Sequence, residues 1–129
     1  LLSHSSFGAS GAPGAQKMRA ALKALRARNP DFEVDGEMHA DAALVPAIRA
    51  RAVPDSKLTD AANLLVMPDL DSANIAFNLL KAAAEGLQVG PILLGMAKPI
   101  HVLVPSVTAR GIVNMTALAA AQANGLKAG

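Results

Sequence analysis

The sequence predicts an α/β fold with a largely parallel sheet. Short apolar runs of strand length alternate with longer segments in which apolar residues recur at helical spacing. Such alternation is typical of parallel strands joined by helices. The chain has 129 residues, of which 52% are apolar and 17% are charged. A chain of this length can bury one substantial core, so we expect one compact unit.

Strands and helices alternate in the first half of the chain. The predicted strands span residues 1–4, 32–34 and 63–67, and the predicted helices span 16–28 and 39–51. In the first helix Met18, Ala21, Leu22 and Leu25 repeat at helical spacing, and Asn29-Pro30 ends it. Asp35-Gly36 turns the chain toward the second helix, whose expected apolar stripe is Leu44, Val45, Ile48 and Ala52.

The second half continues this pattern. A helix that begins at Asp71 or Ser72 is expected to end near Glu85-Gly86. Two short strands and a closing helix follow, over residues 88–94, 100–104 and about 107–124. Gly125 is well placed to terminate the closing helix. Because Leu1-Leu2-Ser3 begins as if in the middle of a strand, we expect the chain to be a piece of a longer protein.

Composition argues against several classes of function. Twelve basic and ten acidic residues give a net charge of only +2, and the basic residues of the first helix have no aromatic neighbours for stacking, so we expect no nucleic-acid partner. The apolar stretches are broken well before the roughly 18 residues that a membrane helix needs. The chain has no cysteine, which excludes disulfides and thiolate-bound metals. We therefore expect a protein of the cytoplasm.

The histidines and serines do not form a recognisable catalytic or metal-binding pattern. His4, His39 and His101 lie far apart in the sequence, and none is paired with a second ligand at helical spacing, so we expect no metal site. Ser3 and Ser5 flank His4, but neighbouring residues of a strand point to opposite faces. A serine hydrolase is therefore disfavoured.

Three acidic residues could act as general acids or bases, namely Asp35, Glu37 and Asp41. Asp35 begins a turn, and Asp41 lies near the start of a helix, where carboxylates are favoured in any case. A structural role is thus the favoured interpretation of all three.

Two glycine-containing loops could hold an anionic ligand. The loop that starts at Ser3 and runs to Gly11 offers small hydroxyl side chains and a backbone that a phosphate could approach closely. The segment from Gly90 to His101 joins two apolar runs through a turn, and its only charged side chain is Lys98. Either loop could also be an ordinary connection, and Lys98 a solvated turn residue.

Several separate blocks, in the same order along the chain, resemble the phosphate acetyltransferases and butyryltransferases. These blocks are residues 2–8, Asp35-Gly36-Glu37-Met38, Pro68-Asp69-Leu70 with Asn74, Gly90-Pro91, and Gly95 with Lys98-Pro99. The stretch from Val89 to His101, with Pro105, Arg110 and residues 112–115, is similar in particular to the phosphotransacetylase-like domain at the C-terminus of large bacterial malic enzymes. The resemblance covers essentially the whole chain and implies a three-layer α/β/α fold of the isocitrate/isopropylmalate dehydrogenase type.

The resemblance also indicates which chemistry is missing. In the transferases a Ser and an Arg that follow the Lys-Pro block act on the thiol of coenzyme A and on the acyl group, and an Asp lies a few residues beyond. Val104, Pro105 and Gly111 stand at these three places. Valine offers no hydrogen bond and proline no guanidinium, so we expect no catalytic residue and no transfer activity in this chain.

What the resemblance leaves is a binding cleft. The residues expected to contact the ligand are Ser3, Ser5, Ser6, Gly8, Asn74, Gly90, Pro91, Lys98, His101 and Arg110. The implied function is that of a dimerising or higher-order domain that senses acetyl-coenzyme A, in a malic enzyme whose separate catalytic domain uses NADP and a divalent metal. The alternatives are a genuine phosphate acetyltransferase and a purely structural dimerisation module.

Overall fold

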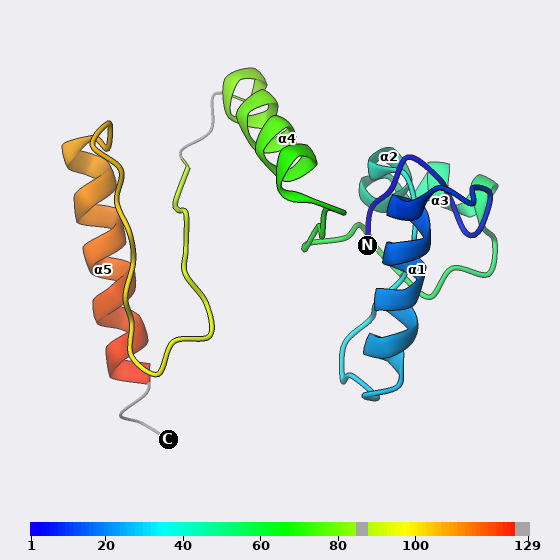
Figure 1. The fold of residues 1–129 in the computed structure, drawn as a ribbon, viewed down its shortest axis with the longest axis horizontal. Helices are drawn as coiled ribbons and strands as arrows, with labels where there is room; N and C mark the ends of the chain where they lie inside the picture. The colour runs from blue at the N-terminus through cyan, green and yellow to red at the C-terminus, as the bar shows by residue number, and fades with distance from the viewer. Residues whose placement is uncertain (85–87, 126–129) are drawn as a thin grey trace. The chain divides into compact units, whose positions relative to one another are not determined.

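The structure is a computed structural model that describes residues 1–84 and 88–125 (Figure 1). Instead of the single compact unit that composition predicts, the residues group into two units, 1–80 and 81–129. The described part of the chain contains the helices α1 (Pro13–Arg26), α2 (Ala40–Leu44), α3 (Pro46–Ala52), α4 (Leu70–Ala83) and α5 (Ala109–Gly125). None of these helices is long and apolar enough to cross a membrane.

Helix α1 confirms part of the apolar face that its sequence predicts. Met18 and Leu22 are buried together with Ala15, whereas Leu25 is half-buried and Ala21 is exposed. The helix begins three residues earlier than predicted, at Pro13, because proline at the first helical position has no amide hydrogen bond to lose. Asn29 adopts a left-handed conformation with φ of 48°, which turns the chain away beyond the end of the helix.

The predicted helix over 39–51 is two helices, α2 and α3, and its predicted apolar stripe is wrong. Val45 has φ of −119° and ψ of 100°, the extended conformation that a following proline imposes. Pro46 therefore ends α2 and begins α3. The break removes the expected helical register, so that Leu44, Val45, Ile48 and Ala52 are exposed, whereas Ala42, Ala43 and Arg49 are buried.

The predicted strands are represented in the described residues by extended backbone and one isolated bridge. Leu2 pairs with Met38 in the parallel direction that the sequence predicts. The Ser3 amide donates to the Met38 carbonyl at 3.0 Å, the Met38 amide to the Leu1 carbonyl at 3.1 Å, and the Leu2 amide to the Val66 carbonyl at 2.8 Å. No strand forms in the described part of 32–34, 63–67, 88–94 or 100–104, because a strand requires a ladder of such bonds along its length.

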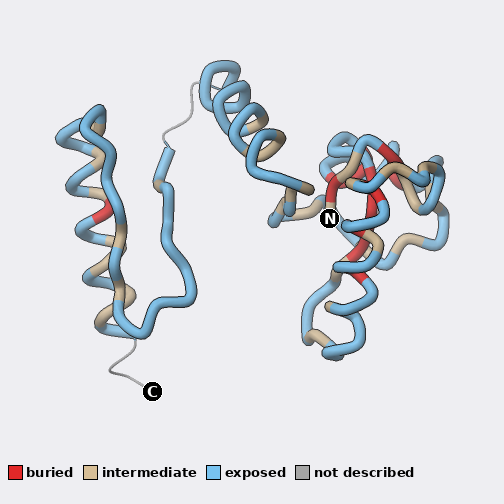
Figure 2. The backbone as a smooth tube through the Cα atoms, in the orientation of Figure 1, coloured by how far each residue is buried: buried red, intermediate tan, exposed pale blue. Residues whose placement is uncertain are grey.

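The core of the first unit lies where these extended segments meet α2. Leu2, Met38, Ala42 and Ala43 are buried together, and Phe7, Leu58, Ala62, Leu65 and Met67 pack against them. In Figure 2 the buried positions of this unit gather on the inner side of α1 and on the segments beside it. In the second unit Met115 on α5 is the one buried residue among those described.

The second unit consists of α5 and the extended segments that precede it. The end that the sequence predicts for α4, near Glu85-Gly86, lies outside the described residues. Helix α5 begins two residues later than predicted, and Gly125 is its last residue. Leu94, Val102 and Val113 leave most of their apolar surface exposed.

Candidate functional site

The predicted ligand residues fall into separate places. Ser3, Ser5, Ser6 and Gly8 share one loop of the first unit, and Asn74 lies on α4. In the second unit Gly90, Pro91 and Arg110 line one cavity, whereas Lys98 lines another. The structure therefore brings together three of the ten residues around one hollow.

Hydrogen bonds within the chain engage much of the Ser-Gly loop. Ser3 Oγ accepts the Ser5 amide at 3.1 Å, and Ser6 Oγ accepts the His39 amide at 3.3 Å. The Gly8 amide donates to Glu37 Oε1 at 3.1 Å. Ser5 Oγ is buried and has no partner among the described residues. The loop is thus held from inside the unit.

Two arginines of α1 hold the acidic residues on either side of Gly36. Arg19 Nη1 lies 2.7 Å from Glu37 Oε1, and Arg26 Nη2 lies 2.7 Å from Asp35 Oδ1. Both carboxylates are buried. Helix α1 and the segment 35–37 are therefore joined by two ion pairs.

The Asp35 carboxylate is fully engaged in holding the fold. Its Oδ1 also accepts the Gly36 amide at 2.9 Å, and its Oδ2 accepts Ser56 Oγ at 2.8 Å and the Lys57 amide at 2.7 Å. Burial alone would raise the pKa of Asp35, but these donors and the charge of Arg26 outweigh it, so the pKa lies below its ordinary value. These contacts confirm the structural interpretation of this residue.

Glu37 and Asp41 are engaged in a similar way. Burial would raise the pKa of Glu37, but the Gly8 amide, its own amide and Arg19 lower it overall. Asp41 Oδ1 accepts the Ala42 amide at 2.7 Å in the first turn of α2, as its position near a helix start predicts.

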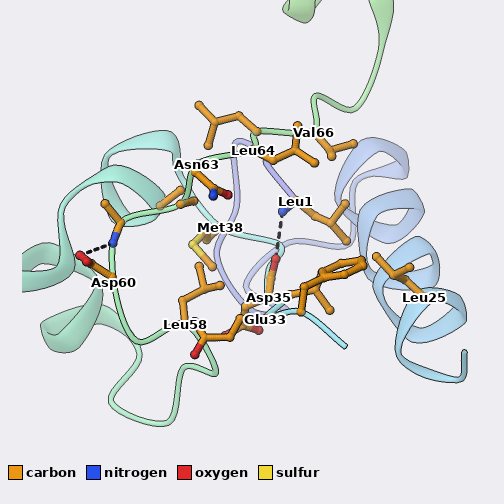
Figure 3. A pocket seen from close by; sticks show the side chains of 16 residues that line it. Leu1, Leu25, Glu33, Asp35, Met38, Leu58, Asp60, Asn63, Leu64 and Val66 are labelled. Carbon is orange, nitrogen blue, oxygen red and sulfur yellow. Dashed lines mark hydrogen bonds between the residues drawn. The ribbon is translucent and has the colours of Figure 1, made fainter. Parts of the chain in front are cut away.

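The cavity of about 660 Å³ in the first unit does not suit an anionic ligand (Figure 3). Its wall is mainly apolar, and the charged side chains that Figure 3 labels around it are acidic: Glu33, Asp35 and Asp60. None of the ten predicted ligand residues lines it.

A cavity of about 330 Å³ in the second unit, beside the start of α5, has the opposite character. We name it the α5 cavity. It is lined by Lys81, Gln88, Val89, Gly90, Pro91, Leu103, Val104, Ser106, Val107, Thr108, Arg110, Gly111, Asn114 and Met115. Among the described residues the lining includes two cations and no acid.

The start of α5 adds to the positive character of this cavity. The first turn of α5 carries no acidic residue, and the amino end of a helix has a positive partial charge. Thr108 Oγ1 accepts the Gly111 amide at 3.1 Å and so satisfies one free donor of that turn. The sequence patterns did not indicate Lys81, Ser106, Thr108 or Asn114, which also line this cavity. Ser106 and Thr108 carried a usable signal, because hydroxyl residues before a helix are typical of its capped end.

Lys98 and His101 lie at the other end of α5. Lys98 lines a cavity of about 300 Å³ together with Gln122 and Gly125 in the last turn of the helix. The His101 ring joins two segments: Nδ1 accepts the Leu93 amide at 3.4 Å, so Nε2 carries the proton and donates to Gln122 Oε1 at 2.9 Å. A cation near the carboxyl end of a helix is stabilised by the helix itself. Lys98 thus has a structural explanation beside the functional one.

Asn74 lies outside these three cavities. It is exposed on α4, where its carbonyl and Oδ1 accept Asn78 Nδ2 at 2.9 Å and 3.1 Å. The described residues contain no group of three or more His, Cys, Asp or Glu that could hold a metal ion.

The fold belongs to the α/β class of the phosphotransacetylases. EutD phosphotransacetylase from Staphylococcus aureus superposes with a TM-score of 0.86 and 29% sequence identity, over 95% of this chain and 38% of that one. Residues 1–120 match the family model described as phosphate acetyl/butaryl transferase. The chain therefore belongs to the phosphate acetyl/butaryl transferase family, as the sequence motifs predict.

Relatives of two kinds share this stretch of sequence. The chain is 55% identical over 124 residues to the NADP-dependent malic enzyme of Escherichia coli (strain K12), a match that covers 95% of this chain and 16% of that protein. It is 45% identical over 122 residues to the phosphate acetyltransferase of Paracoccus denitrificans, with 95% of this chain and 38% of that protein covered. The chain thus spans about one sixth of the length of the malic enzymes that it matches.

Proposed function

We propose that this chain is the regulatory, acetyl-coenzyme A-sensing domain of an NADP-dependent malic enzyme and has no transferase activity of its own. The observation that carries the proposal is the α5 cavity. Lys81 and Arg110 line it without any acidic partner among the described residues. Val104 and Gly111, which stand where the resemblance places the transferase Ser and Asp, line the same cavity.

The residues of this cavity support binding better than catalysis. Val104 cannot act as a nucleophile or hydrogen-bond donor, and Gly111 has no side chain, so the groups that would stabilise charge in the transition state are missing. A Cβ atom at Gly111 would lie 2.7 Å from Val107 Cγ2, so the cavity wall leaves no room for an acidic side chain without moving Val107. The cavity therefore keeps groups that can bind a ligand, whereas the residues expected to act in acyl transfer are replaced by unreactive ones.

The chemical character of the α5 cavity suits one end of acetyl-coenzyme A. The guanidinium of Arg110 and the ammonium of Lys81 are suited to phosphate, and Ser106 and Asn114 add hydrogen-bonding groups. Pro91 and Leu103 supply apolar wall. A cavity of about 330 Å³ lies at the small end of the range for ligand sites, so we propose that it takes one part of the ligand.

The remaining predicted residues enter the proposal as further contacts. The Ser-Gly loop with Ser3, Ser5, Ser6 and Gly8 belongs to the first unit, together with Asn74. Lys98 and His101 belong to the second unit. We propose that the domain to which this chain belongs has the three-layer α/β/α architecture with a largely parallel sheet.

The wider context of the proposal rests on the malic enzyme relatives. Because the chain spans 16% of the Escherichia coli protein, the oxidative decarboxylation of malate, the NADP and the divalent metal are assigned to a catalytic domain outside this chain. Acetyl-coenzyme A would act by preferring one arrangement of a homo-oligomer, a dimer or larger. Exposed apolar side chains on α5, such as Ile112 and Val113, are available for such contacts. We propose a cytoplasmic location because the chain has no cysteine.

The second candidate is a genuine phosphate acetyltransferase, which forms acetyl phosphate and coenzyme A from acetyl-coenzyme A and phosphate. The 45% identity to the Paracoccus denitrificans enzyme favours it. The replacements at Val104, Pro105 and Gly111 weigh against it.

Two measurements on the same protein separate these functions. Calorimetric titration with acetyl-coenzyme A is expected to show saturable binding that Arg110→Gln weakens about tenfold, the value of one charge-assisted hydrogen bond. Arg51→Gln, an exposed arginine of α3, is the matched control and should leave the affinity unchanged. Incubation with acetyl phosphate and coenzyme A should yield no acetyl-coenzyme A. Product formation would establish the transferase, and an absence of binding would favour the structural module.

A further inference from the structure

Two consecutive residues of the Ser-Gly loop have left-handed backbone. Phe7 has φ of 48° and Gly8 has φ of 90°. For a bulky residue such as phenylalanine this conformation is unusual and costs free energy, so the surrounding contacts must hold it in place. Successive amides in turns of this kind point toward one side of the chain and form a concave donor group that binds anions.

The acceptor for these amides is Glu37. The Phe7 amide donates to the Glu37 carbonyl at 2.7 Å, and the Gly8 amide donates to Glu37 Oε1 at 3.1 Å. The Glu37 side chain is 0% exposed. Glu37 therefore occupies both donors at which the sequence suggested an external phosphate, the Gly8 amide through its carboxylate and the Phe7 amide through its backbone carbonyl.

Arg19 completes this arrangement. Its Nη1 lies 2.7 Å from Glu37 Oε1, and its Nη2 donates to the Ser10 carbonyl at 2.9 Å, so one guanidinium connects the acid to the far part of the loop. The other carboxylate oxygen, Glu37 Oε2, is buried and has no partner among the described residues. A second anion that approached the Gly8 amide would be repelled by the buried Glu37 carboxylate, whose Oε1 already lies 3.1 Å from the Gly8 nitrogen.

We infer that the Glu37 side chain is a specificity-determining group that occupies the Gly8 amide of the Ser-Gly loop and thereby excludes external phosphate from that amide. The inference rests on the proposed function and deepens it, because the phosphate groups of the ligand are then directed to other donors. In the second unit Lys81 and Arg110 are such donors.

The inference is tested by titrating the whole chain with inorganic phosphate at constant ionic strength and following its backbone amides by nuclear magnetic resonance. In the natural chain the Gly8 signal should show no saturable shift at millimolar phosphate. In Glu37→Gln, which keeps the size of the side chain and removes its charge, the Gly8 signal should saturate in that range, at a phosphate concentration at least about tenfold below any saturation of the natural chain. Asp31→Asn, at an exposed acidic residue, is the control and should behave as the natural chain does.

Two results would overturn the inference: a saturable shift of Gly8 in the natural chain, or its absence in a folded Glu37→Gln variant. If Glu37→Gln does not fold, the titration of the natural chain decides. Acetyl-coenzyme A binding is followed separately through the Arg110 and Gly111 amides. A loss of that response would count against the proposed function and leave the Glu37 result standing.

Discussion

Replacing Asp35 by asparagine should destabilise the first unit by about 2 to 4 kcal/mol. The amide side chain can still accept from Arg26 and Gly36 through its oxygen, but its NH₂ group then faces the Lys57 amide, which loses its acceptor. A hydrogen bond to a charged group contributes about 1.5 to 3 kcal/mol. The ion pair with Arg26 adds about 1 kcal/mol at most, because the Arg26 side chain is 43% exposed.

Hydrogen exchange of the α1 amides measures this change directly. The chain has no tryptophan or tyrosine, so fluorescence cannot report on unfolding, whereas the amides of Met18 and Leu22 report on the opening of this unit alone. Asp31→Asn serves as the exposed control. If Asp35→Asn lowers the free energy of opening by less than about 0.5 kcal/mol, the assigned role of this carboxylate is wrong.

The same carboxylate predicts a pH dependence. Its pKa in the folded chain lies below the ordinary value of 3.8, so its contribution is complete above that value and is lost as the pH falls through the lower, folded pKa. Glu37, whose pKa is also lowered, acts in the same direction. The protection factors of the α1 amides, which correct for the intrinsic exchange rate at each pH, should therefore fall below about pH 4, and less steeply in Asp35→Asn than in the natural chain. Equal slopes would contradict the lowered pKa.

Three further substitutions test other contacts. Arg49→Met should lower the free energy of opening of the first unit, measured by hydrogen exchange, by about 3 kcal/mol, because four backbone carbonyls lose a buried donor. Arg51→Met, at an exposed arginine, is the control and should have little effect. Gly111→Ala should lower the thermal midpoint of the second unit, because the added methyl group clashes with Val107. The double variant with Val107→Ala should have the midpoint of the natural chain. A raised midpoint in the single variant would show that no clash occurs. His101→Leu should speed amide exchange in the last turn of α5 severalfold, because it removes the hydrogen bond with Gln122. Unchanged exchange would show that this hydrogen bond does not stabilise the end of the helix.

The sequence predicted the features that depend on residues close together in the chain, such as the apolar face of a helix. The buried face of α1 follows from the spacing of Met18 and Leu22, whereas the helix ends at Arg26, two residues before the end that Asn29-Pro30 predicted. Pro46 carried the information that the next helix is broken, but the apolar spacing on both sides of it masked that signal. The burial of Arg49 could not be predicted, because it depends on carbonyls of α2 and of residues 58–60 that come together only in the folded unit.

The candidate site could be predicted in part, where its residues belong to short sequence motifs. Gly90, Pro91 and Arg110 fall in one cavity, and each belongs to a sequence block that carries the family resemblance. Lys81 was missed because it reaches that cavity from α4, across a separation that no local pattern encodes. The internal use of the Gly8 amide was missed because a loop rich in glycine and serine looks the same whether its anion comes from solvent or from Glu37.

The two ion pairs between α1 and the segment 35–37 limit how this domain can change in length. Arg19 and Arg26 are seven residues apart, close to two full helical turns, so both point to the same side of α1. Inserting or deleting one residue between them would rotate one arginine by about 100° and separate it from its acid. Changes in length should therefore be rejected between residues 19 and 26.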